Sequence, residues 1–132
     1  MLYIINIRTI GKIDRKIYSC ITKDIVTDEV IITDERIQHI RERHPNDYEC
    51  YYDAMKEIVE HPDYLIETNK SNTALVLKEI IAVNNKVFKV VVRLNTSTDN
   101  PQYKNSIITF MKINEKEWKR LLKNKTILYK RE

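Results

Sequence analysis

The 132 residues have the length of one domain, and a composition of 42% hydrophobic and 32% charged residues excludes a disordered or low-complexity chain. No apolar run approaches the ~20 residues that a membrane-spanning helix needs, and the first residues lack the pattern of a signal peptide, so we expect a soluble protein with no membrane contact and no targeting segment of its own. The net charge of +4 is unevenly distributed along the chain. Residues 1–83 carry 11 basic and 15 acidic side chains, whereas residues 84–132 carry 12 basic and 4 acidic ones. The basic second part favours a polyanionic partner such as nucleic acid.

Short strands and two helices are expected in the first half of the chain. The strand patterns cover residues 2–8, 16–22 and 29–32. Thr33 then has the character of a helix N-cap, because acidic residues follow it in the first turn, where carboxylates suit the helix dipole. This helix is expected to stop before Pro45, and a second helix with an apolar stripe fits residues 47–60 and is ended by Pro62.

Strands dominate the second half of the chain. The β-branched, strand-like segments are residues 64–67, 73–83, 86–94 and 106–113. Asn84 and Asn85 tolerate positive φ and predict a tight hairpin between two of these strands. A short helix is expected at residues 115–122, and residues 127–129 are expected to close the sheet as an edge strand. This order predicts a single α+β domain over residues 1–132, in which N-terminal helices pack on one face of a four- to five-stranded antiparallel sheet.

The helix that follows Thr33 carries the first candidate site residues. Arg36, His39 and Arg43 follow one another at i, i+3 and i+7 and therefore share one face of that helix. The two neighbouring guanidinium groups favour the neutral imidazole of His39, which is able to accept a proton. They also offer a place for a phosphate group. His44 instead continues the buried stripe near the end of the helix.

Two later strands carry the second group of candidates. Lys89 and Arg93 lie on one face of their strand, because side chains alternate between the two faces. In the next strand Ser106 shares a face with Lys104, whereas Thr109 lies on the opposite face of an ideal pleat. A β-bulge would change that alternation.

Neither a metal site nor a cofactor is expected. His39 and His44 are five residues apart, which is not the spacing of the HExxH zinc motif. His61 is the only other histidine, and Cys20 and Cys50 lie too far apart in the sequence to form a CxxC pair. The two cysteines are expected to be buried or incidental thiols of a protein in a reducing compartment.

In combination, these segments are similar to a known group of nucleases. The chain resembles the phage- and toxin-associated nucleases of the barnase–EndoU–colicin–RelE (BECR) superfamily in its helix ITDERIQHIRERHP, its strands VVVRL and NSIITFMKI, and its closing ILY. The helix contributes the pattern His-Ile-x-x-x-His after a Thr-x-x-Arg start, and the later strand contributes Ser-x-x-Thr. The resemblance spans about residues 12–130 and implies a helix-then-antiparallel-sheet fold, metal-independent ribonuclease chemistry and frequent use as a toxin.

The resemblance assigns roles to individual positions of this sequence. The predicted function is a metal-independent, toxin-like endoribonuclease, in which a ribose 2′-OH attacks the adjacent phosphorus and leaves a 2′,3′-cyclic phosphate. The predicted catalytic residues are His39, His44, Arg93, Ser106 and Thr109. The predicted phosphate-binding residues are Arg36, Arg41, Arg43, Lys89 and Lys104.

RNA, either tRNA or mRNA, is the expected partner, and the cytoplasm is the expected site of action. The protein is expected to act either free-standing or as the C-terminal part of a larger toxin. A cytotoxic ribonuclease also needs a cognate immunity protein or antitoxin in the cell that produces it.

Two other functions remain open on the sequence alone. A non-catalytic RNA-binding module would use the same basic strands, with Tyr103 or Phe88 stacking on bases. Salt-sensitive binding without cleavage would favour that reading. An immunity-type protein-binding domain would use the acidic first part of the chain to mask a basic partner, and tight binding to a protein but not to RNA would favour it.

Overall fold

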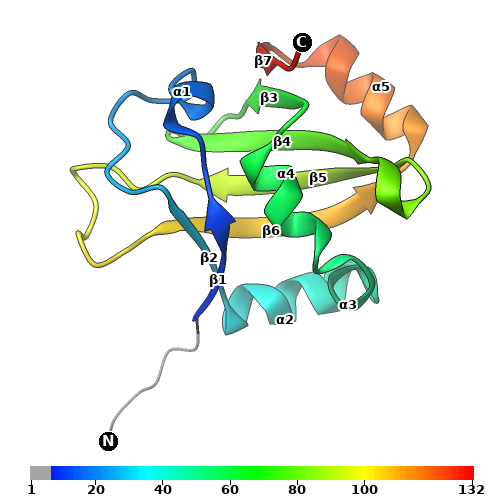
Figure 1. Cartoon of the computed structure of the whole chain (residues 1–132), viewed down its shortest axis with the longest axis horizontal. Helices are drawn as coiled ribbons and strands as arrows, with labels where there is room; N and C mark the ends of the chain where they lie inside the picture. Colours follow the sequence, from blue (N-terminus) through cyan, green and yellow to red (C-terminus); the bar gives the residue numbers. More distant parts are fainter. Residues whose placement is uncertain (1–6) are drawn as a thin grey trace, which may run out of the picture.

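A seven-stranded mixed sheet forms the centre of the computed structural model, which describes residues 7–132 (Figure 1). The strands lie across the sheet in the order β1-β2-β6-β5-β4-β3-β7. Their bounds are Ile7–Lys12 (β1), Glu29–Thr33 (β2), Tyr64–Glu67 (β3), Thr73–Ile80 (β4), Lys86–Arg93 (β5), Asn105–Ile113 (β6) and Ile127–Lys130 (β7). All neighbouring strands are antiparallel except β2 and β6, which are parallel and pair Val30 with Asn105.

The expected sheet of four to five strands is therefore too small, and the expectation that all strands are antiparallel is wrong. β1 and β2 form an antiparallel pair that joins the sheet through β2, and β7 joins the opposite edge beside β3. Both additions pair segments that are far apart in the sequence, and the period of a strand does not reveal its partners. Of the strand expected at residues 2–8, only the end falls in β1, and residues 2–6 lie outside the described part of the chain.

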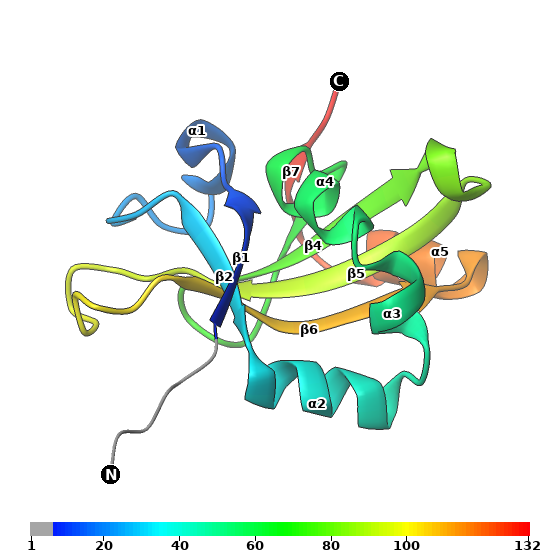
Figure 2. The same cartoon turned by 60° about the horizontal axis from the view of Figure 1, so that its bottom comes forward.

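Helices lie on both faces of the sheet (Figures 1 and 2). Their bounds are Arg15–Tyr18 (α1), Asp34–Arg43 (α2), Asp47–Tyr51 (α3), Ala54–Glu60 (α4) and Glu115–Asn124 (α5). Helices α1 to α4 contribute to the main core on one face of the sheet, which we call the helix-covered face. Helix α5 packs on the other face, although all helices were expected on one face. None of the helices in residues 7–132 is long and apolar enough to cross a membrane.

The side chains of β5 alternate between two apolar layers. Phe88, Val90 and Val92 are fully buried in the main core, where they meet α2, α3 and α4. Val87 points the other way and packs with Leu121 of α5 in a smaller second core. Because α5 covers only one end of this second face, the remainder of the face is left open.

The segment at residues 16–22, expected as a strand, contains α1 instead. Asp14 caps this short helix by accepting a 2.9 Å hydrogen bond from the Lys16 N–H. Tyr18 is fully buried and donates its hydroxyl to the Val59 carbonyl at 2.8 Å. The tertiary contact with α4 thus outweighs the local strand preference.

The helix expected over residues 47–60 is divided into α3 and α4. At the break the Met55 N–H donates to the Tyr52 carbonyl at 3.1 Å, three residues back instead of four. This tighter turn redirects the chain, and both Tyr48 before it and Met55 after it are buried.

Other local predictions are confirmed. The Thr33 hydroxyl accepts a 3.3 Å hydrogen bond from the Arg36 N–H and caps α2, which ends before Pro45. Asn84 and Asn85 both adopt the expected positive φ, at 58° and 56°, but the expected tight hairpin is wrong, because residues 81–85 join the two strands. The strand before them ends at Ile80 rather than at residue 83, because Ile81–Val83 form a 3₁₀ turn.

Candidate active site

The open part of the second sheet face carries polar side chains from β5 and β6. Directly paired residues of neighbouring strands point to the same face, and the register pairs Arg93 with Ser106 and Val91 with Thr109. Arg93 lies on the face opposite to Val92, which is buried in the main core. Arg93, Ser106 and Thr109 therefore share the open face.

A β-bulge in β6 is responsible for this arrangement. Val91 pairs with Thr109 and Val92 pairs with Ile107, so Ile108 has no partner on β5. The extra residue shifts the alternation, as a β-bulge does. The expectation for an ideal pleat, which placed Thr109 opposite to Ser106, is wrong for this reason.

Arg93 is held in place by the loop that follows β5. Its Nη2 donates to the Asp99 carboxylate at 3.0 Å, and its Nη1 donates to the Leu94 carbonyl. A guanidinium has five N–H donors, so donors remain for a ligand, and the side chain is 36% exposed. Within residues 7–132 the hydroxyls of Ser106 and Thr109 donate no hydrogen bond to the protein, which leaves them available.

Helix α2 runs along the edge of β6. β2 pairs only with the first residues of β6, and the chain then turns into α2. Ile37 and Ile40 of α2 are buried in the main core. Just past the helix, the Asp47 carboxylate accepts a 3.0 Å hydrogen bond from the Lys112 N–H. This bond fixes the end of α2 beside the end of β6 (Figure 2).

The two exposed flanks of α2 face different surroundings. On one flank Arg41 forms an ion pair with Glu49 of α3 and lies over the Tyr48 ring, 5.2 Å from its centre. The hydrogen bond from Arg41 lowers the pKa of Glu49. Because α3 belongs to the helix-covered face, this flank of α2 is turned away from the open face.

Arg36, His39 and Arg43 lie on the other flank of α2. Residues at these spacings share one side of a helix, and the buried Ile37 and Ile40 separate this side from the flank of Arg41. The stripe therefore faces away from α3 and from the ion pair between Arg41 and Glu49. His39 and Arg43 are exposed and Arg36 is half-buried.

His44 is placed apart from the other candidates. It forms the C-cap of α2, where its N–H donates to the Ile40 carbonyl at 2.8 Å. The nearby bond between Asp47 and Lys112 puts it at the far end of β6. Ser106 and Lys112 are six residues apart, which corresponds to about 20 Å of strand. The structure thus separates His44 from the pair of Arg93 and Ser106, and it turns Arg41 toward α3.

Two lysines flank the open face. Lys104 lies two residues before Ser106 and forms a 3.5 Å ion pair with Glu29 of β2. Lys89 lies two residues before Val91 in β5, on the same face of the sheet, and is close to α5. The pKa of Glu117 in α5 is lowered mainly by a hydrogen bond from Arg120, and the charge of Lys89 lowers it further.

Asp99 is a site residue that the sequence analysis missed. Its carboxylate accepts hydrogen bonds from the Thr96 N–H at 2.8 Å and from the Thr96 hydroxyl at 3.0 Å, in addition to the bond from Arg93. The polar segment around it predicted only a loop. The one local signal is a side-chain turn typical of Asp in such segments.

Residues 7–132 contain no group of three or more His, Cys, Asp or Glu side chains arranged to hold a metal ion. Cys20 and Cys50 are both free, and both are exposed, so neither is a buried thiol. The polar groups gathered on the open face are instead hydroxyls and guanidinium groups, which suit the binding of an anion.

A family model for the phage-Barnase-EndoU-ColicinE5/D-RelE like nuclease2 family matches residues 6–130. The chain belongs to this nuclease family. The resemblance drawn from the helix and strand motifs is thereby confirmed over almost the whole sequence of the nuclease. Searches of curated proteins and of solved structures found no match to this nuclease.

Proposed function

We propose that this nuclease is an endoribonuclease that cleaves RNA without a metal ion, by attack of a ribose 2′-OH on the adjacent phosphorus. The bulge in β6 carries the proposal, because it aligns Arg93, Ser106 and Thr109 on one open face. Membership of a nuclease family and the basic flank of α2 beside that face support it. The proposed substrates, tRNA or mRNA, place its action in the cytoplasm.

The proposed reaction needs a base, a clamp for the phosphate and a proton for the leaving group. His39 removes the proton from the 2′-OH, and the resulting oxygen attacks phosphorus while the bond from phosphorus to O5′ breaks. Water protonates the leaving O5′ and the protonated His39 returns its proton to the resulting hydroxide, so the products are a 2′,3′-cyclic phosphate and a free 5′-OH. Both product ends can be identified chemically.

Groups on both sides of the site are proposed to stabilise the negative charge that develops on the phosphoryl oxygens. Arg93 and Arg36 supply guanidinium N–H donors, which match a phosphate in pairs. Ser106 and Thr109 supply hydroxyl donors aimed at the same oxygens. Arg43, Lys89 and Lys104 are assigned to the flanking phosphates of the RNA. His44 and Arg41 are left out of the reacting group because of their positions.

The decisive experiment is incubation of the purified protein with total tRNA and rRNA in EDTA, followed by analysis of the product ends. We expect cleavage with cyclic phosphate ends and no cleavage of 2′-deoxy substrates, because these lack the attacking hydroxyl. His39→Ala is expected to lower the cleavage rate by about 10²–10⁴-fold.

His61→Ala is the matched control, because His61 is also an exposed histidine and follows α4 rather than α2. Its cleavage rate should equal that of the unmodified protein. Full activity of His39→Ala would remove His39 from the reaction. Salt-sensitive RNA binding without any cleavage would replace the proposal by a binding module.

A further inference from the structure

An apolar row crosses the open face of the sheet and is not used by the reaction proposed above. The register pairs Val91 of β5 with Leu75 of β4 on one side and with Thr109 of β6 on the other. Directly paired residues point to the same face, so these side chains lie side by side on the open face. Val90 and Val92 on the helix-covered face are fully buried, whereas Val91 and Leu75 are only half-buried. Apolar surface is thus left in contact with solvent in the middle of a polar site.

Met111 extends this apolar surface toward α5. It lies two residues after Thr109 in β6, diagonally opposite to Val91, which is within reach of a long side chain. Leu75 and Met111 both pack against the second core and are half-buried. We call Leu75, Val91 and Met111 the apolar platform. It is bounded by α5 at one end and by the row of Arg93 at the other.

A cation lies on each side of the apolar platform. Arg93 and Lys89 are two residues after and two residues before Val91 in β5, so all three side chains point to the open face. Each cation is about 7 Å of strand away from Val91, and the two cations are about 13 Å apart. An apolar surface between two cations is complementary to a chain in which flat rings are attached between phosphates.

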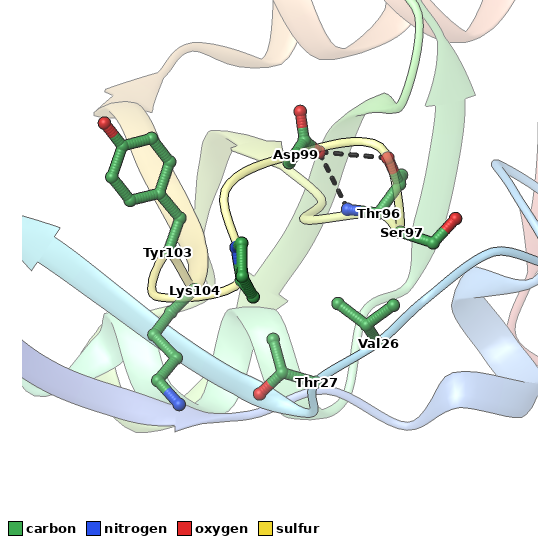
Figure 3. A pocket seen from close by; sticks show the side chains of 8 residues that line it. Val26, Thr27, Thr96, Ser97, Asp99, Tyr103 and Lys104 are labelled. Atoms are coloured by element: carbon green, nitrogen blue, oxygen red, sulfur yellow. Dashed lines mark hydrogen bonds between the residues drawn. The ribbon is translucent and has the colours of Figure 1, made fainter.

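The Arg93 side of the platform is fixed by the loop after β5. Figure 3 shows the Asp99 carboxylate bound by the N–H and the hydroxyl of Thr96, at 2.8 and 3.0 Å. This carboxylate accepts one N–H of Arg93, and a guanidinium has five such donors. The charge of Asp99 therefore orients the guanidinium and leaves donors for a phosphate.

The Lys89 side of the platform has its own carboxylate, Glu117 of α5. Glu117 accepts two hydrogen bonds from Arg120, at 2.8 and 2.5 Å. Within residues 7–132 Lys89 itself forms no ion pair. The Lys89 ammonium group is thus available for a second phosphate, and neither carboxylate belongs to the platform.

The chemistry of the platform determines which part of a nucleotide it contacts. The side chains of Leu75, Val91 and Met111 have no N–H or O–H group, so they do not read the donor and acceptor pattern of a base edge. They contact the face of a ring, which every base has. The thioether of Met111 adapts to rings of different size.

We propose that the apolar platform binds the face of one nucleobase of single-stranded RNA and does not discriminate between bases. The RNA runs along β5, with the scissile phosphate at Arg93 and a following phosphate at Lys89. The inference rests on the proposed function for the position of the scissile phosphate. The base has to leave its stack to lie on the sheet, so the platform selects single-stranded RNA.

The test measures binding separately from cleavage. The probes are fluorescein-labelled 2′-O-methyl hexanucleotides of adenosine, cytidine or uridine, which lack the attacking hydroxyl, and a 2′-O-methyl strand of equal length without bases. Fluorescence anisotropy gives the dissociation constants for the unmodified protein, Val91→Ser and Val91→Ile. Thermal unfolding checks that each variant is folded. Should Val91→Ser not fold, Val91→Thr, which keeps the shape and the strand preference of valine, takes its place.

Val91→Ser replaces two methyl groups by a hydroxyl and is expected to weaken binding of all three hexanucleotides by about 3- to 10-fold. Val91→Ile keeps the apolar surface and should change binding by less than about twofold. The strand without bases should bind all proteins equally. Ile127→Ser is the matched control, because Ile127 is an exposed apolar residue of the edge strand β7, and it should bind every probe like the unmodified protein.

Unchanged hexanucleotide binding by Val91→Ser would overturn the platform, and so would an equal loss for the strand without bases. A loss for one hexanucleotide alone would overturn the lack of discrimination between bases.

The outcomes for the platform and for the proposed function can be told apart. Val91-dependent binding by a protein that cleaves no RNA would overturn the proposed function and support the platform. Cleavage by a protein whose Val91→Ser variant binds the hexanucleotides like the unmodified protein would overturn the platform alone.

Discussion

Asp99 links Arg93 to the loop between β5 and β6. The pKa of Asp99 is held below its ordinary value of 3.8, mainly by the hydrogen bond that the carboxylate accepts from the Thr96 N–H. The hydrogen bond from the Thr96 hydroxyl and the charge of Arg93 lower this pKa further. Because the folded carboxyl has the lower pKa, these interactions contribute stability above the unfolded value. The contribution is lost as the pH falls through the folded value.

Replacement of Asp99 by asparagine tests this linkage. The unmodified protein should have a larger free energy of unfolding than Asp99→Asn near neutral pH, and the difference should shrink below about pH 4. Urea denaturation at a series of pH values measures it. Asp53→Asn is a suitable control, because Asp53 is exposed and its side chain makes no capping bond. A difference that stays constant down to about pH 3 would contradict the assignment.

The element on which the site depends most is α2, since it carries His39 and Arg36. Its first turn is capped by the Thr33 hydroxyl, which accepts from the Arg36 N–H at 3.3 Å. Its buried stripe of Ile37 and Ile40 holds it against β6. A loss of the cap therefore affects the same turn from which Arg36 projects.

We expect Thr33→Ala to lower the free energy of unfolding by about 1 kcal/mol, because the first-turn N–H loses its partner. Thr33→Ser keeps the hydroxyl and should lose only a fraction of that amount. Chemical denaturation of the three proteins provides the measurement. Equal losses in both variants would show that the methyl group of Thr33, rather than its hydroxyl, stabilises the helix.

At the scale of the whole molecule, one ion cluster ties the last strand to the sheet. Lys78 of β4 has a side chain that is only 5% exposed, and it donates to Asp63 at 3.2 Å. Arg131, after β7, forms a 3.0 Å ion pair with the same carboxylate, and its N–H donates to the Asp63 carbonyl at 2.8 Å. Asp63 therefore connects β4 with the end of the chain.

Asp63→Ala should lower the free energy of unfolding by about 3–5 kcal/mol, because it leaves the buried ammonium group of Lys78 without a partner. The double variant Asp63→Ala with Lys78→Met should recover much of this loss, since the uncompensated charge is gone. Arg131→Ala should cost less than about 1 kcal/mol, because the Arg131 side chain is 59% exposed. Urea denaturation compares the four proteins, and no recovery in the double variant would refute the explanation.

Charge is also organised at this scale. The basic second part of the sequence forms β5, β6 and α5, which make or border the open face. The acidic first part forms α3 and α4 on the helix-covered face, with Asp47, Glu49 and Glu57 among their residues. The fold thus turns an asymmetry along the sequence into an asymmetry between the two faces of the sheet.

The sequence by itself determined the features that depend on neighbours within a few residues. The cap at Thr33, the shared flank of Arg36, His39 and Arg43, and the positive φ of Asn84 are of this kind. The strands of the second half follow from their local period and composition for the same reason. These features, together with the family motifs, sufficed to identify the nuclease family.

The tertiary structure alone decided which of these elements meet. The parallel pairing of β2 with β6 joins residues about 75 positions apart, and the bulge at Ile108 that turns Thr109 toward Ser106 appears only in the register with β5. The packing of α5 on the second face and the bond from Asp99 to Arg93 likewise depend on distant partners. Strand pairing and side-chain burial are collective and long-range, so the local pattern leaves several registers and faces open.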